Sequence, residues 1–252
     1  MIVDISSYLG FWPYWGNPYA EETGEKLIKL MDQNHIDKAL VVSTKSIFYN
    51  PVEGNELVFQ VAERYRGRII PTISISIMQQ EDPSSYLEEC LDRGAKAVRL
   101  YPYYHGYKLR PDNKALAKLV NSATAMNCPI IIPLRLLMNW GFYTLSIQEV
   151  ITFVKEFPTT RFVIGGFNYG EFYELLNLAK TVEGVYLDTT CLTMMDGIKR
   201  LTAEVPKRKI LCGTGSPLQN PACGLIKISE ADINEEMKEL ILGVNAVELF
   251  KL

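Results

Sequence analysis

Eight short apolar runs recur along the 252 residues, and most are separated by segments with a helical pattern. Most of these runs are dense in Val, Ile and Leu without polar alternation, which is typical of parallel strands covered on both faces. Consecutive parallel strands need a crossover, so we expect the intervening segments to be helices. The runs span residues 1–6, 38–43, 69–76, 96–101, 129–134, 161–165, 185–189 and 209–213.

The segments between the runs carry apolar residues at three- and four-residue spacing. Leu116, Leu119 and Val120 form one such stripe, on a helix predicted over residues 114–125. A second helix is predicted to begin at Ser146, which has the pattern of a capping box with Glu149. Eight strand–helix units favour an α/β fold, a single (β/α)8 barrel domain over residues 1–252. The segment from about residue 230 to residue 250 is expected to close the outer ring of helices.

The charge and cysteine content narrow the class of protein. The formal net charge is −3, from 26 basic and 29 acidic residues without a basic block, which argues against nucleic-acid binding. No apolar run approaches the roughly 20 residues of a membrane span. The chain enters a strand directly, without a positively charged leader, and its five cysteines form no CxxC pair. We therefore expect a cytoplasmic protein with reduced cysteines and no membrane partner.

Several segments along the chain are informative through their order and spacing. They are Gly-Ala-Lys-Ala-Val-Arg-Leu-Tyr-Pro at 94–102, Pro-Ile-Ile-Ile at 129–132, Gly-Val-Tyr-Leu-Asp-Thr at 184–189, Lys-Ile-Leu-Cys-Gly-Thr at 209–214 with Ser-Pro at 216–217, and the segment 241–250 with its Asn-Ala pair. Together these segments resemble the amidohydrolase-related barrel proteins, a family that includes small-molecule hydrolases and decarboxylases. The resemblance extends over essentially the whole chain and implies a (β/α)8 barrel that acts on a small molecule.

The positions of the metal ligands implied by this resemblance are substituted. The family holds its metal with two histidines on strand one, one histidine at the end of each of strands five and six, and an aspartate ending strand eight. This sequence has Ser6, Tyr8, Pro133, Gly166 and Gly215 at those positions. Proline and glycine offer no side-chain donor, and neutral serine and tyrosine are poor ligands. We therefore expect no metal ion and no other cofactor.

Candidate catalytic residues follow from the position of barrel sites at the carboxyl ends of strands. Tyr8 is expected to donate a hydrogen bond, and His105 or Asp188 to transfer a proton near neutral pH. Two alternatives stay open: Asp188, which keeps the residue found in the family, could instead orient a neighbour, and His105 could simply be exposed in its loop.

Candidate binding residues are chosen by period-two alternation, which selects the side chains that face the lumen. Arg135, with Lys45 and Arg99, is expected to form a cationic pocket for a carboxylate or a phosphate, because arginine suits bidentate recognition of such groups. The alternative places Arg99 in an outward ion pair and Lys45 in solvent. The binding set is completed by Ser6, Trp12 and Asn168.

The loops after the first and fourth strands are rich in aromatic residues, which suit the walls of a pocket for a ring-shaped ligand. Loop packing or a subunit interface explains them equally well. Segment 213–216, Gly-Thr-Gly-Ser, resembles a phosphate cradle, although a glycine replacing a lost aspartate is the better explanation. The aromatic residues are Phe11, Trp12, Tyr14, Trp15, Tyr101, Tyr103, Tyr104 and Tyr107.

Two functions are consistent with these features. The first is a metal-independent hydrolase or lyase that acts on a small anionic or aromatic molecule. The second is a family member without catalysis that binds a small molecule or serves in assembly, and a homodimer fits both. A closed, polar pocket in the lumen with Arg135 pointing inward would favour an enzyme or a binding protein, whereas a mouth plugged by the loop of Trp12 and Trp15 would favour a relic scaffold.

Overall fold

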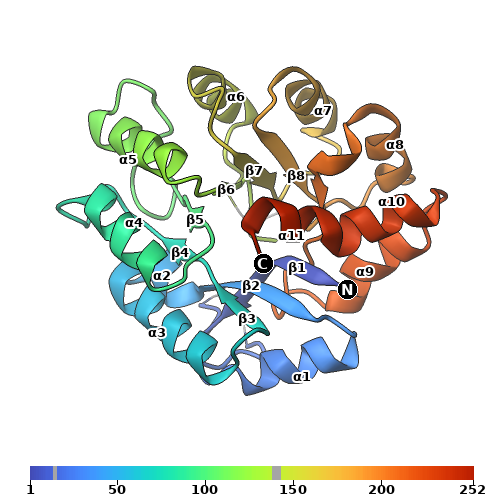
Figure 1. Cartoon of the computed structure of the whole chain (residues 1–252), viewed down its shortest axis with the longest axis horizontal. Helices are drawn as coiled ribbons and strands as arrows, with labels where there is room; N and C mark the ends of the chain where they lie inside the picture. Colours follow the sequence, from blue (N-terminus) through green and yellow to red (C-terminus); the bar gives the residue numbers. More distant parts are fainter. Residues whose placement is uncertain (14–15, 138–142) are drawn as a thin grey trace.

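A computed structural model describes residues 1–13, 16–137 and 143–252, and it shows an α/β barrel of parallel strands surrounded by helices (Figure 1). Tyr14 and Trp15 lie outside the described residues. The strands are β1 (Val3–Leu9), β2 (Lys38–Ser43), β3 (Ile69–Pro71), β4 (Ile73–Ser74), β5 (Val98–Arg99), β6 (Ile130–Pro133), β7 (Phe162–Gly165), β8 (Val185–Asp188) and β9 (Ile210–Leu211). The α-helices are α1 (Glu25–Gln33), α2 (Thr44–Phe48), α3 (Pro51–Arg64), α4 (Pro83–Asp92), α5 (Lys114–Ala125), α6 (Ile147–Glu156), α7 (Phe172–Thr181), α8 (Gly197–Glu204), α9 (Pro221–Ser229), α10 (Glu235–Glu239) and α11 (Asn245–Phe250), and a π-helical segment, Leu240–Val244, joins α10 to α11.

The barrel is closed by hydrogen bonds at two junctions between its sheets. The ladders run in the orders β1-β2-β3 and β4-β5-β6-β7-β8-β9, all parallel. β3 and β4 are two parts of the third barrel strand, and between them Thr72 donates its main-chain N–H to Val41 at 2.9 Å. At the other junction, Ile5 donates to the carbonyl of Cys212 at 3.0 Å and Tyr8 to that of Ser216 at 2.7 Å. The predicted (β/α)8 barrel is thereby confirmed.

The ends of several strands differ from the prediction. β1 continues to Leu9 rather than ending at Ser6, with a shift of register between Asp4 and Ser7. The predicted third run is interrupted at Thr72, and β5 is limited to Val98–Arg99. Apolar runs locate a buried strand but not the points where its ladder stops, because the flanking residues remain buried in the loops.

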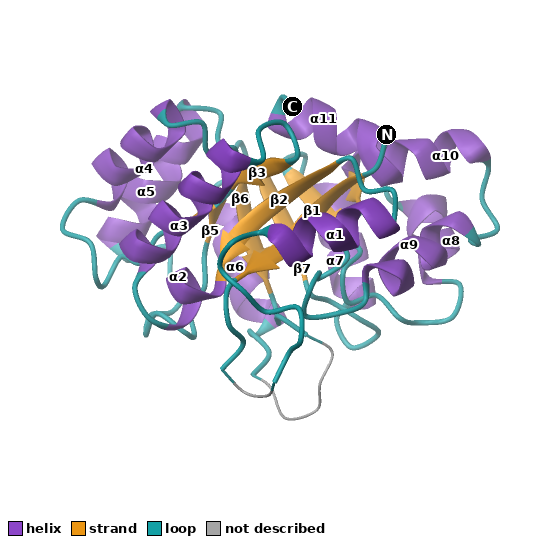
Figure 2. Cartoon of the chain, turned by 90° about the horizontal axis from the view of Figure 1, so that it is seen from below, coloured by secondary structure: helices purple, strands orange, loops and turns teal. Residues whose placement is uncertain are grey.

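The C-terminal segment does more than extend the outer ring of helices. α11 crosses the amino-terminal end of the barrel in Figure 1, and both chain termini lie at that end in Figure 2. Ala246, Leu249 and Phe250 pack there against the lower lumen residues, which are Val3, Ile5, Leu40, Ala97, Ile131, Val163 and Leu211. The three-residue and four-residue spacing in α11 places its apolar side chains on one face, and that face covers the base of the lumen. Any site is therefore left to the opposite end.

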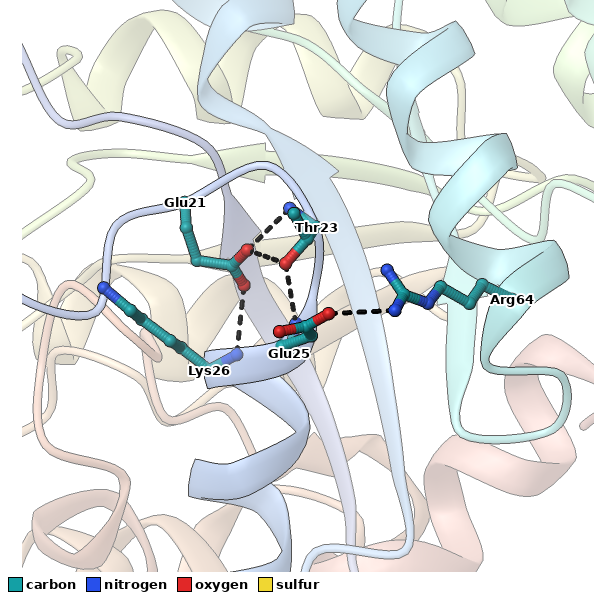
Figure 3. Close-up of polar contacts among 5 residues, drawn as sticks. All are labelled: Glu21, Thr23, Glu25, Lys26 and Arg64. Atoms are coloured by element: carbon teal, nitrogen blue, oxygen red, sulfur yellow. Dashed lines mark hydrogen bonds and ion pairs between the residues drawn. The ribbon is translucent and has the colours of Figure 1, made fainter.

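Two local anchors fix the loops at that opposite end. The predicted capping box is wrong: the Ser146 side chain makes no cap hydrogen bond, and Glu149 instead accepts the main-chain N–H of Leu109 at 2.6 Å, which ties the loop after β5 to α6. In the loop after β1, the Glu21 carboxylate accepts main-chain N–H groups of Thr23 at 2.6 Å and Lys26 at 3.1 Å (Figure 3). These acceptors satisfy donors at the start of α1, which has no side-chain cap of its own.

None of the described helices combines the length and apolar character that a bilayer crossing requires. The five cysteines are free thiols, and four of them are buried.

Candidate functional site

The lumen above the apolar base contains a buried cation, Arg99. Its guanidinium crosses the barrel from β5, because Nη2 donates to the carbonyls of Ile5 at 2.7 Å and Leu40 at 3.3 Å on β1 and β2, and Nε donates to Thr72 Oγ1 at 2.9 Å. Arg99 is 1% exposed. Among the described residues no carboxylate lies within ion-pair distance of it and Nη1 has no hydrogen bond. The outward ion pair considered as an alternative is therefore excluded.

Two tyrosines lie close to this cation. Ser6 and Tyr8 lie two residues apart on β1, and both are buried. Tyr101, two residues after Arg99, is buried as well. Burial raises the pKa of Tyr101 to about 12, and the Arg99 charge opposes this rise. Burial likewise raises the pKa of Tyr8 well above its ordinary value, with Tyr101 adding to the rise. Both hydroxyls are thus protonated donors, and that of Tyr101 has no hydrogen-bond partner within the described chain.

Asp188 ends β8 in a space kept open by two glycines. Its Oδ1 accepts the main-chain N–H of Thr190 at 2.8 Å and the Thr190 hydroxyl at 2.6 Å. A Cβ built on Gly165 would lie 2.6 Å from Oδ2, and one built on Gly213 would lie 2.1 Å from Oδ1. Burial raises the pKa of Asp188 to about 6, and the Thr190 hydrogen bonds oppose the rise. The carboxyl group therefore titrates near neutral pH, as proton transfer requires, but it is tightly held.

Because of this raised pKa, we expect Asp188 to make the free energy of unfolding depend on pH. The folded-state pKa, about 6, exceeds the ordinary value of 3.8, so the folded protein binds the proton more tightly than the unfolded chain. The free energy of unfolding should rise as the pH falls from about 7 to about 4, by about 3 kcal/mol at about 1.4 kcal/mol per pH unit. Asp188→Asn should remove this contribution in denaturant titrations across that range. An unchanged pH dependence in the variant would show that other groups cause it.

The mouth of the barrel is covered by a group of buried residues that we call the mouth plug. It comprises Tyr8, Trp12, Val42, Ile47, Tyr101, Leu136 and Leu137. Trp12 is only 6% exposed, and its ring meets Phe48 edge to face at 5.5 Å between centroids. The cavity beside the plug, lined by Tyr101, Pro133, Arg135 and Tyr143, has a volume of about 10 Å³. That volume is about enough for one water molecule. The mouth thus has the plugged form, with Trp12 in the plug, that we expected of a scaffold, and a ligand would enter only by displacing side chains of the plug.

Arg135 and Asn168 lie at the mouth and are held by neighbours. Arg135 forms an ion pair with Glu171 at 2.5 Å and donates to Thr144 at 3.2 Å. Asn168 donates its amide to Thr193 at 2.6 Å and accepts the Thr193 main-chain N–H at 3.2 Å. The charge of Arg135 is thus already balanced, so Arg99 rather than Arg135 offers the cation without a counter-ion.

Lys45 and His105 do not join the lumen group. Lys45 pairs with Glu53 at 2.7 Å, with both side chains partly exposed, so it adds little to a cationic pocket. His105 is buried rather than exposed, and its Nε2 donates to the main-chain carbonyl of Ser46 at 3.1 Å. Its ring also contacts Tyr101, and burial lowers its pKa. His105 therefore fastens the loop after β5 to helix α2.

The sequence reasoning missed two charged groups that organise this end of the barrel. Asp4 accepts four hydrogen bonds, from the main-chain N–H groups of Ser6 and Thr214 and from the hydroxyls of Ser7 and Thr214. Lys227 on α9 donates to the carbonyls of Thr189 and Thr190. The aspartate in the first strand run was the available signal for Asp4, whereas nothing local marks Lys227, because its acceptors are main-chain atoms 37 and 38 residues away.

The phosphate cradle expected at 213–216 has its donors occupied. The N–H of Thr214 is bonded to Asp4, that of Gly215 to the Ser6 carbonyl, and that of Ser216 to the Thr214 hydroxyl. The first two of these bonds join the segment after β9 to β1. Because all three N–H donors are occupied, none of them is available to an anion.

The residues at the expected metal positions do not fit a divalent ion. Gly166 has a φ of +71°, and a Cβ there would lie 2.3 Å from the carbonyl oxygen of Arg135. Gly215 also has a positive φ, a backbone conformation that favours glycine. Tyr8 packs in the apolar mouth plug. In the part of the chain that the structure describes, no three His, Cys, Asp or Glu side chains gather as a metal-binding group. The donor set thus differs from that of a divalent-metal centre.

Comparison with protein families identifies the chain. The amidohydrolase family model matches residues 26–252. The chain belongs to the amidohydrolase family. A search of curated proteins found no match.

Solved structures with low sequence identity share the fold of this amidohydrolase-family chain over its full length. An uncharacterised TIM-barrel protein from Bordetella bronchiseptica is 18% identical, with a TM-score of 0.74 and 99% and 98% of the two chains covered. The 2,6-dihydroxybenzoate decarboxylase from Rhizobium is 14% identical, with a TM-score of 0.77 and coverage of 99% and 98%. A 5-carboxyvanillate decarboxylase from Novosphingobium aromaticivorans, with bound manganese, is 14% identical, with a TM-score of 0.78 and coverage of 100% and 97%.

Proposed function

We propose that this amidohydrolase-family chain binds a small aromatic carboxylate in its barrel without a metal ion. The observation that carries the proposal is the Arg99 guanidinium, which is 1% exposed and has no carboxylate partner among the described residues. A buried charge is costly unless it is paired, so a site of this kind favours an anion. Nη1 of Arg99 and the hydroxyls of Tyr8 and Tyr101 are the donors for the carboxylate, and arginine with hydroxyl donors suits that group.

The aromatic character of the ligand is supported by the residues around these donors. Trp12, Tyr8 and Tyr101 would form the walls once the plug opens, and flat rings pack well against such side chains. Two of the similar structures are decarboxylases whose names specify aromatic acids. At their low identity the likeness shows the fold alone, so the ligand class rests on the residues of this chain.

The proposal includes the absence of a metal ion, because the side chains at the expected metal positions are poor ligands or have no donor atom. A bound zinc ion lowers the pKa of its water from 15.7 to about 7. At about 1.4 kcal/mol per pH unit, that is on the order of 12 kcal/mol of hydroxide stabilisation. Asp188, the buried carboxyl group with a pKa of about 6, does not replace it, because its Oδ1 already accepts two hydrogen bonds from Thr190. Binding is therefore better supported than hydrolysis.

Calorimetric titration with 2,6-dihydroxybenzoate in the presence of a chelator tests the proposal. We expect binding, and we expect Arg99→Met to weaken it at least tenfold, because a hydrogen-bonded charge pair contributes about 1.5–3 kcal/mol. Arg110→Met is the matched control, since Arg110 is exposed and paired with Asp112. Tyr101→Phe provides a second variant that removes only an unpartnered hydroxyl, and it should weaken binding severalfold. Binding that is absent, or indifferent to both lumen substitutions, would contradict the proposal.

A metal-independent lyase is the second candidate, and the raised pKa of Asp188 is the observation that favours it. In that reaction the carboxyl–ring bond breaks, carbon dioxide leaves, and a proton from Asp188 takes its place on the ring. The same mixtures, assayed for carbon dioxide in chelator, distinguish the two functions. Turnover that Asp188→Asn abolishes would establish the lyase, whereas binding without turnover would establish the binding protein.

A further inference from the structure

Another cavity lies away from the lumen site, between the start of α8 and helix α9. Its volume is about 460 Å³, within the range of about 300–1,000 Å³ that is typical of small-molecule pockets. Thr190 and Thr214, which follow β8 and β9, line it from the barrel side. The lumen donors Arg99, Tyr8 and Tyr101 are not among the described residues that line it, so it is distinct from the site proposed above.

The inner part of this cavity contains a lysine without a carboxylate partner. Lys227 on α9 is partly buried, and its ammonium group donates to the carbonyls of Thr189 and Thr190, the latter at 3.0 Å. An ammonium group has three donors, so one is left for a ligand, and no carboxylate of the described chain forms an ion pair with it. Burial lowers the pKa of Lys227, because the charged form is costly to remove from water. An anionic group in the cavity would offset that cost.

Gln219 supplies a second donor to the same cavity. Within the described chain, its Nε2 makes one long contact, 4.0 Å to the sulfur of Cys191, although a side-chain amide carries two N–H groups. Its main-chain N–H donates to the carbonyl of Gly215 at 3.0 Å, which fixes the position of the residue. A carboxylate has two oxygens that can accept from the lysine and the amide.

The opening of the cavity carries the opposite charge. Asp196, just before α8, and Glu230, just after α9, are exposed lining residues, and neither forms an ion pair among the described residues. The remaining charged lining residues, Lys199 and Asp232, are paired with each other at 2.6 Å. The cavity thus has one cation inside and two carboxylates at its edge. This distribution disfavours a dianion such as phosphate and favours a molecule with both charges.

Two other cavities of similar size lack this combination. The cavity between the end of α1 and the start of α9, of about 480 Å³, has no charged side chain among its described lining residues. The cavity between α3 and β3, of about 510 Å³, is lined by Arg66 and Arg93, and each of them already pairs with a glutamate. These linings therefore offer no charge for a ligand to neutralise.

We propose that the cavity between α8 and α9 binds an α-amino acid with an apolar side chain. The carboxylate of the ligand accepts from Lys227 and Gln219, and its ammonium group lies towards Asp196 and Glu230. The side chain of the ligand lies against the apolar part of the lining, which consists of Leu192, Met194, Ile198 and Ala231.

Calorimetric titration with L-leucine and L-methionine over the millimolar range tests the proposal. We expect both to bind. We expect 4-methylpentanoate, which is leucine without its ammonium group, to bind severalfold more weakly, because exposed ion pairs contribute modestly. We expect 3-methylbutylamine, which lacks the carboxylate, to bind at least tenfold more weakly, because it loses a hydrogen bond to a charged donor.

Variants of the two charged parts of the cavity locate the binding. Lys227→Met should weaken leucine binding at least tenfold, and Lys155→Met, at an exposed lysine of α6, is its matched control. Asp196→Asn combined with Glu230→Gln should weaken leucine binding severalfold without weakening that of 4-methylpentanoate, with Glu156→Gln as the control. Circular dichroism must show the wild-type spectrum for each variant. If Lys227→Met does not fold, the double variant at the opening decides.

Several outcomes would overturn the proposal. Failure of both amino acids to bind would do so, as would a leucine affinity that the folded cavity variants leave unchanged. Binding of 4-methylpentanoate or inorganic phosphate as tight as that of leucine would also do so, because the cavity would then recognise an anion alone. The titrations contain no aromatic carboxylate, so their result is independent of what the lumen binds.

Discussion

Gly166→His is expected to lower the free energy of unfolding by about 3 kcal/mol, and not to restore a metal ligand. A Cβ at this position would lie 2.3 Å from the carbonyl oxygen and 2.8 Å from the nitrogen of Arg135, both main-chain atoms that cannot move aside. The φ of +71° adds strain for any side chain. Overpacking of about 1–3 kcal/mol and left-handed strain of about 1–2 kcal/mol together give this magnitude.

Gly170→His is the matched control for this substitution. It introduces the same side chain four residues later, where nothing lies within 4 Å of the new Cβ, so its stability should stay within about 0.5 kcal/mol of wild type. Denaturant unfolding of both variants, with elemental analysis after incubation with zinc and manganese, provides the measurement. A Gly166→His protein of normal stability that takes up one equivalent of metal would show that the backbone adapts and that the family's centre can be rebuilt.

Asp4→Ala is expected to lower the free energy of unfolding by about 4 kcal/mol. The Asp4 carboxylate accepts from Ser6 N–H at 3.0 Å, Thr214 N–H at 2.8 Å, and the hydroxyls of Ser7 and Thr214 at 2.5 Å each. Alanine leaves buried donors unsatisfied at about 1–3 kcal/mol each, and two of them are main-chain groups that cannot turn to other partners. The loss falls on the junction that closes the barrel between β9 and β1.

Two further variants test whether the loss comes from the Asp4 carboxylate: Asp4→Asn is a graded change at the same position, and Asp112→Ala is a surface control. The asparagine keeps one acceptor oxygen, so its loss of stability should be about half that of alanine. Asp112 is an exposed partner of Arg110, and its removal should change stability by less than about 1 kcal/mol. Equal denaturant midpoints for wild type and Asp4→Ala would show that the barrel does not depend on this carboxylate for closure.

The candidate site was only partly predictable from sequence. Tyr8 and Asp188 were expected at the carboxyl ends of strands, and they lie there. Ser6 was expected there too, but it lies in the middle of β1, because the strand continues to Leu9. Which of the two arginines, Arg99 or Arg135, has a carboxylate partner was not predictable from the sequence. Arg135 has an acidic neighbour 36 residues later in the chain, and Arg99 finds carbonyl acceptors 94 and 59 residues earlier. Local spacing carries no information about such partners.

The amino-acid sequence by itself determined the succession of buried strands and amphipathic helices, because burial on both faces of a parallel sheet demands continuous apolar runs. It also determined the loss of donor atoms at Pro133, Gly166 and Gly215, since a residue type either has a ligating side chain or lacks one. Only the tertiary structure decided that Trp12 and the leucines at 136 and 137 cover the mouth, and that Arg99 is buried without a carboxylate partner among the described residues. These features arise from contacts between strands and loops distant along the chain, and their energies depend on burial and charge pairing, which exist only once the barrel has closed.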